Sequence, residues 1–488
     1  MDFNIKNREL WDAMISSIPL ASQHITSHFV EMNRDVKEKP IVIVADEEQA
    51  SSFRQMARPP QHSRQLSAVL SDAEKIFACR MRMDHPAAFG FIPSPVSPLS
   101  FIGDMLTSAF NAHAGSWVQS SGPSAVEGAL IRFLAERVGF PETAGGLFVS
   151  GGSMANLTAL MIARDQKLGQ SGQKRAKGVA YVSDQTHSSV AKGLRVLGFT
   201  DIQIRKIKCN GLFQMDVEAL RSAITLDKEQ GMLPFLIVAS CGTTNTGSID
   251  PLRAIITLAR NQSPSLWVHV DGAYGASVAM SKSHRDLLDG LGEVDSVSWD
   301  AHKWLFQTYG CGMALVRERR WLSQSFATGA EYTRDAPDSE DLDSPNFWNF
   351  GSELTRPARC MKLWFTMQVL GSDAIGEMID HGFKLADVAD AELRRLPNWE
   401  IISKAQMAIV NFRYAPPRRN EEELDTLNTA ISKSLIQQNV ATALTTKLLG
   451  KTVIRICSIN PNLTEDEMRG IILALDSAAK SLSITGSS

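Results

Sequence analysis

Short apolar runs that end in small or polar residues recur along the middle of the chain. Six of them cover residues 146–150, 178–184, 235–240, 266–271, 296–300 and 311–316. Runs this short and this apolar are typical of strands buried on both faces of a sheet. Helical patterns separate several of the runs, as at 156–164 and 217–224. This alternation predicts an α/β fold with a mostly parallel sheet, in which a ligand lies beyond the carboxyl ends of the strands.

The pattern differs on either side of this region. Residues 1–80 show mixed helical patterning, and 85–100 contain four prolines, which favour an extended, irregular segment because proline fixes φ. Near the C-terminus, 452–460 predicts a strand, and Thr464 is placed to cap a following helix. We therefore expect a helical and extended segment, a large α/β domain and a smaller α+β domain, over residues 1–100, 101–385 and 386–488.

Charge and hydropathy exclude several classes of partner. The 488 residues carry 50 basic and 53 acidic side chains, a formal net charge of −3. This balance gives no electrostatic reason to expect a nucleic acid or an anionic membrane as a partner. The chain has no run of about 20 apolar residues, and its first residues lack a signal-peptide profile, so we expect a cytoplasmic protein without a membrane span. An enzyme that acts on a small molecule is the remaining default.

The six cysteines are widely spaced, and none lies within four residues of another. The chain therefore lacks the CxxC pairs that many zinc sites use. So few cysteines in a chain of this length do not indicate a disulfide framework. We expect reduced cysteines that fill core positions, and we expect no metal site.

The first candidate for chemistry is the turn between the strand predicted at 146–150 and the helix that follows it. This turn contains Gly151, Gly152 and Ser153. Glycine lets the backbone approach a ligand closely, and a helix N-terminus presents free N–H groups to an anion. The turn is therefore a candidate phosphate cradle, although a plain glycine turn between strand and helix would have the same sequence.

Two further candidates follow later strands. Asp271 ends the strand at 266–271, where a charge is costly unless it is paired. Lys303 follows the next predicted strand, beside His302 and between two tryptophans, which is unusual for a solvated lysine. A lysine in such surroundings suits Schiff-base formation with an aldehyde, although a surface lysine is the simpler interpretation of this residue alone. A lysine, an acid for a pyridinium nitrogen and a helix N-terminus for a phosphate are together what pyridoxal phosphate (PLP) requires.

These segments resemble the group II PLP-dependent amino acid decarboxylases, the family of aromatic L-amino acid, histidine and glutamate decarboxylases. The sequences HVDGAYGAS (269–277) and DAHKW (300–304) carry the resemblance, which extends from about residue 80 to 370 and is weaker at both ends. It implies the PLP-dependent fold type I of aspartate aminotransferase, with PLP as cofactor. It also implies an amino acid substrate, and a homodimer that the N-terminal segment helps to form and whose active site lies at the subunit interface.

The resemblance implies a role for each matching residue. Lys303 looks like the Schiff-base lysine, and Asp271 looks like the acid that keeps the pyridine nitrogen protonated. His187 matches the histidine that stacks on the ring, and Thr244 matches a threonine near the cofactor and the substrate carboxylate. We expect these four residues to be catalytic and to contact the cofactor.

Other matching residues are expected to contact the cofactor only. Ala273 would lie under the ring, where a larger side chain would clash. The expected phosphate contacts are Gly151, Gly152, Ser153 and His302. Asp300 occupies a position where the family also contacts phosphate, but a carboxylate beside a phosphate is unfavourable, so we expect a weaker, indirect role.

Four residues fall in segments that line the substrate pocket in the family: Phe91, Pro93, Ser94 and Trp117. Aromatic residues more often pack in cores, so a pocket role and a core role stay open for Phe91 and Trp117. The identity of the substrate does not follow from these residues. An aromatic L-amino acid is slightly favoured, and acidic and diamino substrates stay open.

One departure from the family concerns a tyrosine on a mobile loop, which assists protonation of the substrate Cα. An ungapped count back from residues 356–364 places Phe347 at that position, and Tyr332 is the only tyrosine at 331–346. Relatives with phenylalanine there produce an aldehyde, ammonia and peroxide. The sequence therefore predicts an amino acid decarboxylase and leaves open an aldehyde synthase, a transaminase of the same fold and a non-catalytic PLP-binding protein.

Overall fold

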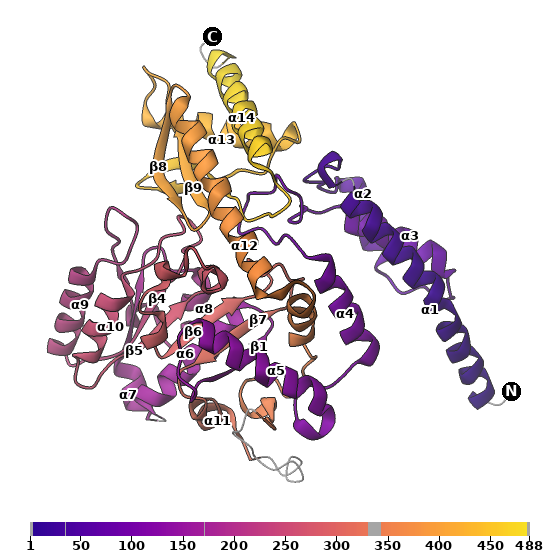
Figure 1. The fold of residues 1–488 in the computed structure, drawn as a ribbon, viewed down its shortest axis with the longest axis horizontal. Coiled ribbons are helices and arrows are strands. Elements are labelled where there is room, and N and C mark those ends of the chain that lie inside the picture. The colour runs from indigo at the N-terminus through magenta and orange to yellow at the C-terminus, as the bar shows by residue number, and fades with distance from the viewer. Residues whose placement is uncertain (1–2, 35, 170, 330–342, 486–488) are drawn as a thin grey trace.

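The computed structural model describes residues 3–34, 36–169, 171–329 and 343–485. Its centre is a seven-stranded sheet with the strand order β1-β7-β6-β5-β4-β2-β3 (Figure 1). The strands of this sheet are β1 (Gly145–Val149), β2 (Gly178–Ser183), β3 (Ile204–Ile207), β4 (Leu233–Ser240), β5 (Trp267–Asp271), β6 (Ser296–Asp300) and β7 (Gly312–Val316).

Strand directions confirm the prediction of a mostly parallel sheet. The pairs β3–β2, β2–β4, β4–β5 and β5–β6 are parallel, whereas β7 runs antiparallel to both β6 and β1. All six predicted runs form strands of this sheet, and β3 is the strand that the pattern did not reveal. Six strands therefore share one direction, and their carboxyl ends meet at one edge of the sheet.

Helices cover both faces of the sheet. They are α6 (Gly152–Leu168), α7 (Gly172–Lys177), α8 (Ser188–Val196), α9 (Val217–Glu229), α10 (Leu252–Arg260) and α11 (Arg320–Phe326). Side chains of β5 alternate between two apolar clusters, because Val268 and Val270 join one cluster and Trp267 joins the other. Every residue of β5 is buried, as expected for a strand with helices on both sides.

A smaller unit follows at the C-terminal end of the described chain. Its antiparallel sheet has the order β10-β11-β9-β8. The unit contains β8 (Trp399–Gln406), β9 (Ile409–Tyr414), α13 (Glu421–Gln437), β10 (Leu444–Leu448), β11 (Lys451–Cys457) and α14 (Glu465–Thr485). The predicted cap of α14 is present, since the hydroxyl of Thr464 accepts a hydrogen bond from the N–H of Glu467 at 3.2 Å.

Helix α12 (Cys360–Arg395) joins the two sheets and bends at Gly371, where φ is +78°. Its apolar residues from Cys360 to Ile379 pack into the core around the large sheet, whereas Leu385, Val388 and Leu393 pack into the core of the smaller unit. The change of core lies close to the predicted boundary at 385. The division of the chain into three domains stays a prediction.

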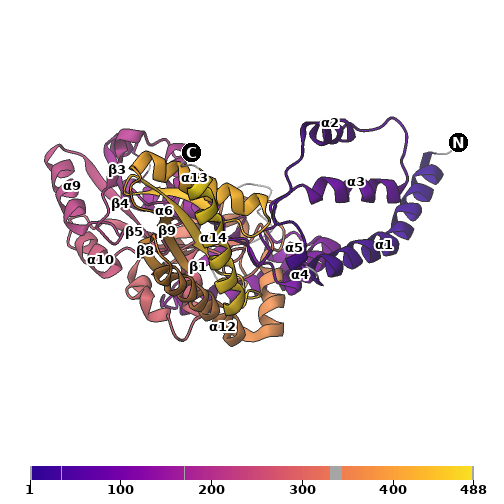
Figure 2. The same ribbon diagram turned by 90° about the horizontal axis from the view of Figure 1, so that it is seen from above.

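Five helices precede the large sheet: α1 (Phe3–Arg34), α2 (Glu47–Met56), α3 (Leu66–Ala78), α4 (Pro98–Phe110) and α5 (Trp117–Arg137). Figure 2 shows that α1, α2 and α3 extend away from the rest of the molecule. The proline-containing segment forms turns and isolated bridges up to Ser97, and α4 begins at Pro98, where proline fits a first helical turn. Within the described ranges, none of the helices is both long and apolar enough to cross a membrane.

Candidate active site

A cavity of about 380 Å³ lies at the carboxyl ends of β1, β2, β4, β5 and β6, where the sequence pattern predicts a ligand. All ten residues expected to contact the cofactor line it. These residues are Gly151, Gly152, Ser153, His187, Thr244, Asp271, Ala273, Asp300, His302 and Lys303. The structure therefore brings together side chains and backbone that lie about 150 residues apart in the sequence. Their individual roles stay predictions.

The turn between β1 and α6 has the shape that a phosphate cradle needs. A Cβ atom at Gly152 would lie 2.7 Å from Oδ2 of Asp300 and 2.9 Å from Cβ of Ala273, so only glycine fits there. The N-terminus of α6 has no side-chain cap. Because the first N–H groups of a helix have no partner within the helix, this end can receive an anion.

Lys303 lies in the turn that follows β6. Its Nζ atom is 3.2 Å from Oδ2 of Asp300, and Nε2 of His302 is 3.5 Å from the same oxygen. The other oxygen of Asp300, Oδ1, is buried and has no hydrogen-bond partner among the described residues. An unsatisfied buried carboxylate oxygen beside a lysine indicates a site built for a polar ligand.

His302 has a ring that lies between two hydrogen-bond acceptors. Its backbone N–H donates to the carbonyl oxygen of Cys311 at 3.1 Å, and its Nδ1 lies 3.1 Å from the same oxygen. A carbonyl oxygen only accepts, so Nδ1 carries a proton. Burial lowers the pKa of His302 although Asp300 opposes the shift. The second ring nitrogen, Nε2, lies 3.5 Å from Oδ2 of Asp300, so both ring nitrogens face acceptors.

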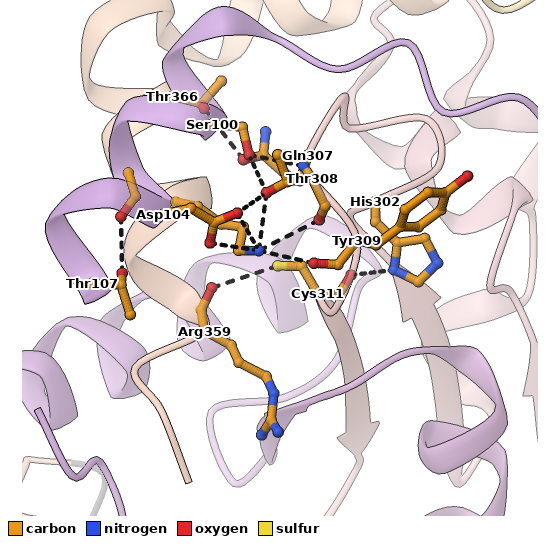
Figure 3. Close-up of polar contacts among 12 residues, drawn as sticks. Ser100, Asp104, Thr107, His302, Gln307, Thr308, Tyr309, Cys311, Arg359 and Thr366 are labelled. Atoms are coloured by element: carbon orange, nitrogen blue, oxygen red, sulfur yellow. Dashed lines mark hydrogen bonds and ion pairs between the residues drawn. The ribbon is translucent and has the colours of Figure 1, made fainter. Parts of the chain in front are cut away.

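The segment that carries His302 and Lys303 is anchored on its far side by α4 and α12. Lys362 Nζ is 2.7 Å from Oδ1 of Asp104, 2.9 Å from Oγ1 of Thr308 and 3.0 Å from the carbonyl oxygen of Tyr309. The hydroxyl of Thr308 also donates to Asp104. Figure 3 shows Asp104 and Thr308 on one side, and the rings of His302 and Tyr309 next to each other on the other side.

Asp271 is buried at the end of β5 and accepts three hydrogen bonds. The donors are Nδ2 of Asn156 at 3.0 Å, the hydroxyl of Ser298 at 3.2 Å and the N–H of Ala273 at 3.1 Å. Burial raises the pKa of Asp271, but the charge of Lys303 and the hydrogen bonds from Ala273 and Asn156 help to outweigh it and hold the pKa below its ordinary value. Asp271 is therefore an ionised carboxylate, which is what a protonated ring nitrogen requires of its partner.

His187 directly precedes α8 and caps its N-terminus. Its Nδ1 accepts a hydrogen bond from the N–H of Ser189 at 3.2 Å and lies 2.8 Å from the hydroxyl oxygen of the same residue. Burial lowers the pKa of His187, with Asp271 acting in the opposite direction. The ring is neutral, and Nδ1 is occupied as an acceptor.

The cavity that the described residues of one chain form is not lined by any of the four residues expected in the substrate pocket. Phe91 has a side chain that is largely exposed, at 61%. Pro93 is buried, and the hydroxyl of Ser94 donates to the carbonyl oxygen of His302 at 2.6 Å. Trp117 begins α5, and its N–H donates to Oδ1 of Asn346 at 3.0 Å. The substrate-binding roles of these residues stay predictions.

Of the two residues expected on the mobile loop, Tyr332 and Phe347, the structure describes one. Tyr332 lies outside the described residues. Phe347 is fully buried in a short 3-10 helix (Phe347–Asn349), edge-on to Phe350 at 5.7 Å between ring centroids, with the Arg356 guanidinium 4.9 Å from its ring. The structure therefore places Phe347 in the core beside β1 and not at the cavity.

Sequence reasoning missed several residues that line the cavity, among them Asn156, Gln185 and Ser189. Asn156 carried the clearest signal, because it is a polar residue one turn after Gly152 in an otherwise apolar stretch of helix. Residues four apart share one face of a helix, so Asn156 faces the same side as the glycine turn. Its partners depend on strand register, which the sequence pattern does not give.

Comparison with known proteins places the chain in a family. Residues 51–415 match the model of the pyridoxal-dependent decarboxylase conserved domain. The aromatic-L-amino-acid decarboxylase of Bacillus atrophaeus is 38% identical over 404 residues, which cover 83% of each chain. The phenylacetaldehyde synthase of Arabidopsis thaliana is 29% identical over 418 residues and 84% of each chain.

A solved structure agrees with these matches. The structure of Oryza sativa TDC with PLP and tryptamine has a TM-score of 0.89 and 25% identity, and the match covers 96% of this chain and 98% of that chain. The predicted fold type I architecture is confirmed, and PLP is the cofactor. The glycine turn and the ionised Asp271 fit that cofactor. The chain belongs to the family of pyridoxal-dependent amino acid decarboxylases.

Proposed function

We propose that the protein removes the α-carboxylate of an L-amino acid as CO₂ and releases the amine, with aromatic amino acids slightly favoured. The convergence of Lys303, Asp271 and the N-terminus of α6 on one cavity carries this proposal. The name of the 38% identical relative, an aromatic-L-amino-acid decarboxylase, supports the substrate preference.

Each group of residues has a place in this reaction. Bound PLP supplies an aldehyde and a ring that accepts the electron pair left when CO₂ departs. Gly151, Gly152 and Ser153 would bind the phosphate, and Lys303 would bind the aldehyde carbon and later return to it to release the product. Asp271, ionised in the folded protein, would hold a proton on the ring nitrogen and so keep the ring electron-deficient.

The remaining residues orient the reactants. Ala273 lines the cavity, where its small side chain would leave room for the ring. His187, a neutral ring, can stack on the cofactor without adding a positive charge near the substrate. Thr244 follows β4 at the cavity wall, where a hydroxyl can bind the substrate carboxylate.

A second candidate is an aldehyde synthase, which couples decarboxylation to oxidative deamination by oxygen. One observation favours it over a transaminase and over a non-catalytic protein, namely the match to a phenylacetaldehyde synthase. A transaminase would need a keto-acid acceptor, and a non-catalytic protein would bind PLP without turnover. The match to a decarboxylase family argues against the transaminase, and the ten residues expected to contact the cofactor, which all line one cavity, argue against the non-catalytic protein.

We also propose a cytoplasmic homodimer with the active site at the subunit interface. Helix α1 exposes Leu10, Trp11, Ile15 and Ile18, each at least half exposed, and extends away from the body of the chain (Figure 2). An apolar surface of this kind is usually covered by a partner. Sedimentation equilibrium of the purified protein at several concentrations measures the mass, and a monomer throughout would contradict the dimer.

A panel of L-amino acids tests the reaction. The purified protein, loaded with PLP, is incubated with each one while CO₂, amine, aldehyde and peroxide are measured together. Equal yields of CO₂ and amine without peroxide support the decarboxylase, whereas aldehyde and peroxide in equal yield support the synthase. Lys303→Ala should abolish multiple turnover, and a Lys303→Ala protein that still turns over would overturn the central assignment.

A further inference from the structure

Asn156 connects the two cavity residues that the proposed function places around the ring. It lies on α6, and its side chain is almost fully buried. Its Nδ2 atom is 3.0 Å from Oδ2 of Asp271 and 2.9 Å from the hydroxyl of Ser189. Its Oδ1 atom is 2.9 Å from Nε2 of His269. One amide therefore has partners for its oxygen and for both of its N–H groups.

The chemistry of the partners fixes the direction of these hydrogen bonds. An ionised carboxylate only accepts, so the NH₂ group of Asn156 must face Asp271 and its oxygen must face His269. Nε2 of His269 therefore carries a proton and donates. The amide cannot flip without placing an oxygen against a carboxylate.

The other ring nitrogen of His269 also has a hydrogen-bond partner. Its Nδ1 lies 2.9 Å from the hydroxyl of Ser296, which accepts a hydrogen bond from Nε1–H of Trp267 at 2.9 Å. Because Trp267 can only donate, the Ser296 proton is free to point to Nδ1. Burial lowers the pKa of His269, so the ring is neutral with its proton on Nε2.

The other arm of the network reaches His187. The hydroxyl oxygen of Ser189 accepts from Asn156, which leaves its own proton free for Nδ1 of His187 at 2.8 Å. The backbone N–H of Ser189 also donates to Nδ1. Nδ1 is thus an acceptor, and the proton of the neutral His187 ring lies on Nε2.

We propose that Asn156 is a positioning residue that holds Asp271 and His187 in one hydrogen-bond network, with its amide oriented by His269. The inference rests on the proposed function, because that function places Asp271 at the ring nitrogen of the cofactor and His187 on the face of the same ring. Asn156 fixes the carboxylate of Asp271 directly and the ring tautomer of His187 through Ser189. It acts on the cofactor by way of these groups and needs no contact of its own with the reacting atoms.

The experiment compares apoprotein variants by titration with PLP, followed by tryptophan fluorescence and by the visible absorption of the bound cofactor. N156L keeps the approximate size and removes all polar contacts. N156D keeps the shape but turns an acceptor oxygen towards Asp271. T158V is the matched control, because Thr158 is buried on the same helix and its hydroxyl bonds only the carbonyl of Met154.

Removing a buried hydrogen bond to a charged group predicts PLP binding that is weaker by about 10- to 100-fold in N156L and N156D, and within about twofold of the parent in T158V. The absorption of the bound cofactor should shift, because Asp271 and His187 are both displaced. Turnover number should fall more than the Michaelis constant changes, since the network acts on the ring and not on substrate capture.

His269 provides a second pair of variants that does not change any residue lining the cavity. H269Q keeps an N–H donor for Asn156 and should bind PLP like the parent, whereas H269L should weaken binding as N156L does. An N156D protein with parental affinity and absorption would overturn the inference, as would equal behaviour of H269Q and H269L. If the parent binds PLP but turns over no amino acid, the proposed function fails, and the binding series still decides the role of Asn156.

Discussion

Arg356 and Glu127 form a buried ion pair that fixes the end of β1. Nη2 of Arg356 lies 2.6 Å from Oε1 of Glu127, and both side chains are almost fully excluded from solvent. The same Nη2 donates to the carbonyl oxygen of Phe148, and Oε1 of Glu127 accepts from the N–H of Phe148. The pair therefore holds both backbone groups of one β1 residue, three positions before the glycine turn.

Removing one partner of this pair leaves the other charge buried and alone. We expect Glu127→Ala and Arg356→Met each to lower the free energy of unfolding by about 3–5 kcal/mol. The midpoint of thermal denaturation of the apoprotein measures the effect. Glu136→Ala, on the exposed face of the same α5 helix, is the control and should have little effect. Single variants as stable as the parent would contradict a structural role for the pair.

Lys362 is expected to stabilise the segment that carries Lys303. It is buried and bonds Asp104, Thr308 and the carbonyl of Tyr309. Hydrogen bonds to charged groups contribute about 1.5–3 kcal/mol each at most, so Lys362→Met should lower the denaturation midpoint and increase proteolysis within 301–311. Limited proteolysis followed by mass spectrometry identifies the cut. Cleavage that increases elsewhere and not in this segment would show that Lys362 has a different role.

His269 predicts a loss of stability in mild acid. Burial lowers its pKa to about 4, below the ordinary value of 6.5. Above pH 6.5 the ring is neutral in both states and the full stability is present. As the pH falls towards 4, the unfolded chain takes up a proton that the folded chain does not, which costs about 3 kcal/mol in all. His187 and His302 act in the same direction.

The measurement is the denaturation midpoint of the apoprotein between pH 8 and pH 5. H269Q should show a weaker pH dependence than the parent. The comparison with H269Q also cancels the contribution of Asp250, whose pKa burial raises to about 6 and which therefore changes stability in the opposite direction. Parallel curves for the two proteins would show that His269 accepts its proton in the folded state.

The structure and the ungapped sequence count predict different effects for a substitution of Phe347. If residue 347 reaches the substrate Cα, Phe347→Tyr should shift the products from aldehyde to amine. Its core position predicts instead an unchanged product ratio and a loss of about 1–3 kcal/mol of stability, because a buried hydroxyl would lack a partner. Product analysis and thermal denaturation of the same sample separate the two outcomes.

Much of the fold followed from local pattern. The apolar runs at 235–240 and 266–271 match β4 and β5 within two residues, because strands buried on both faces have few polar positions. The pattern does not reveal β3, because this strand is four residues long, lies at the sheet edge and includes two charged residues. The antiparallel direction of β7 also could not be predicted, because an apolar run does not indicate the direction of its strand in the sheet.

The sequence predicted the site residues that belong to a recognisable motif. It did not predict the contacts that depend on how the strands pair. Asp271, His302 and Lys303 each lie at or just after the end of a strand, so their positions in the sequence predict that they lie at the ligand-binding edge of the sheet. The alignment of Asp271 with Ser298 depends on the register of β5 against β6, which only the folded sheet defines. An ungapped count misplaces Phe347 as a loop residue, because it does not reveal that Arg356 and Phe350 enclose it.

The position of β1 affects when the protein can bind its cofactor. Among the described strands β1 pairs with β7 alone, and β7 ends at Val316. The first strand of the sheet in the sequence therefore joins the sheet only through the last one. A chain still emerging from the ribosome can assemble β2 to β6, but it has no fixed place for the β1 turn until residues 312–316 are available. We therefore expect the phosphate of PLP to find its complete site only after residues 312–316 have been synthesised.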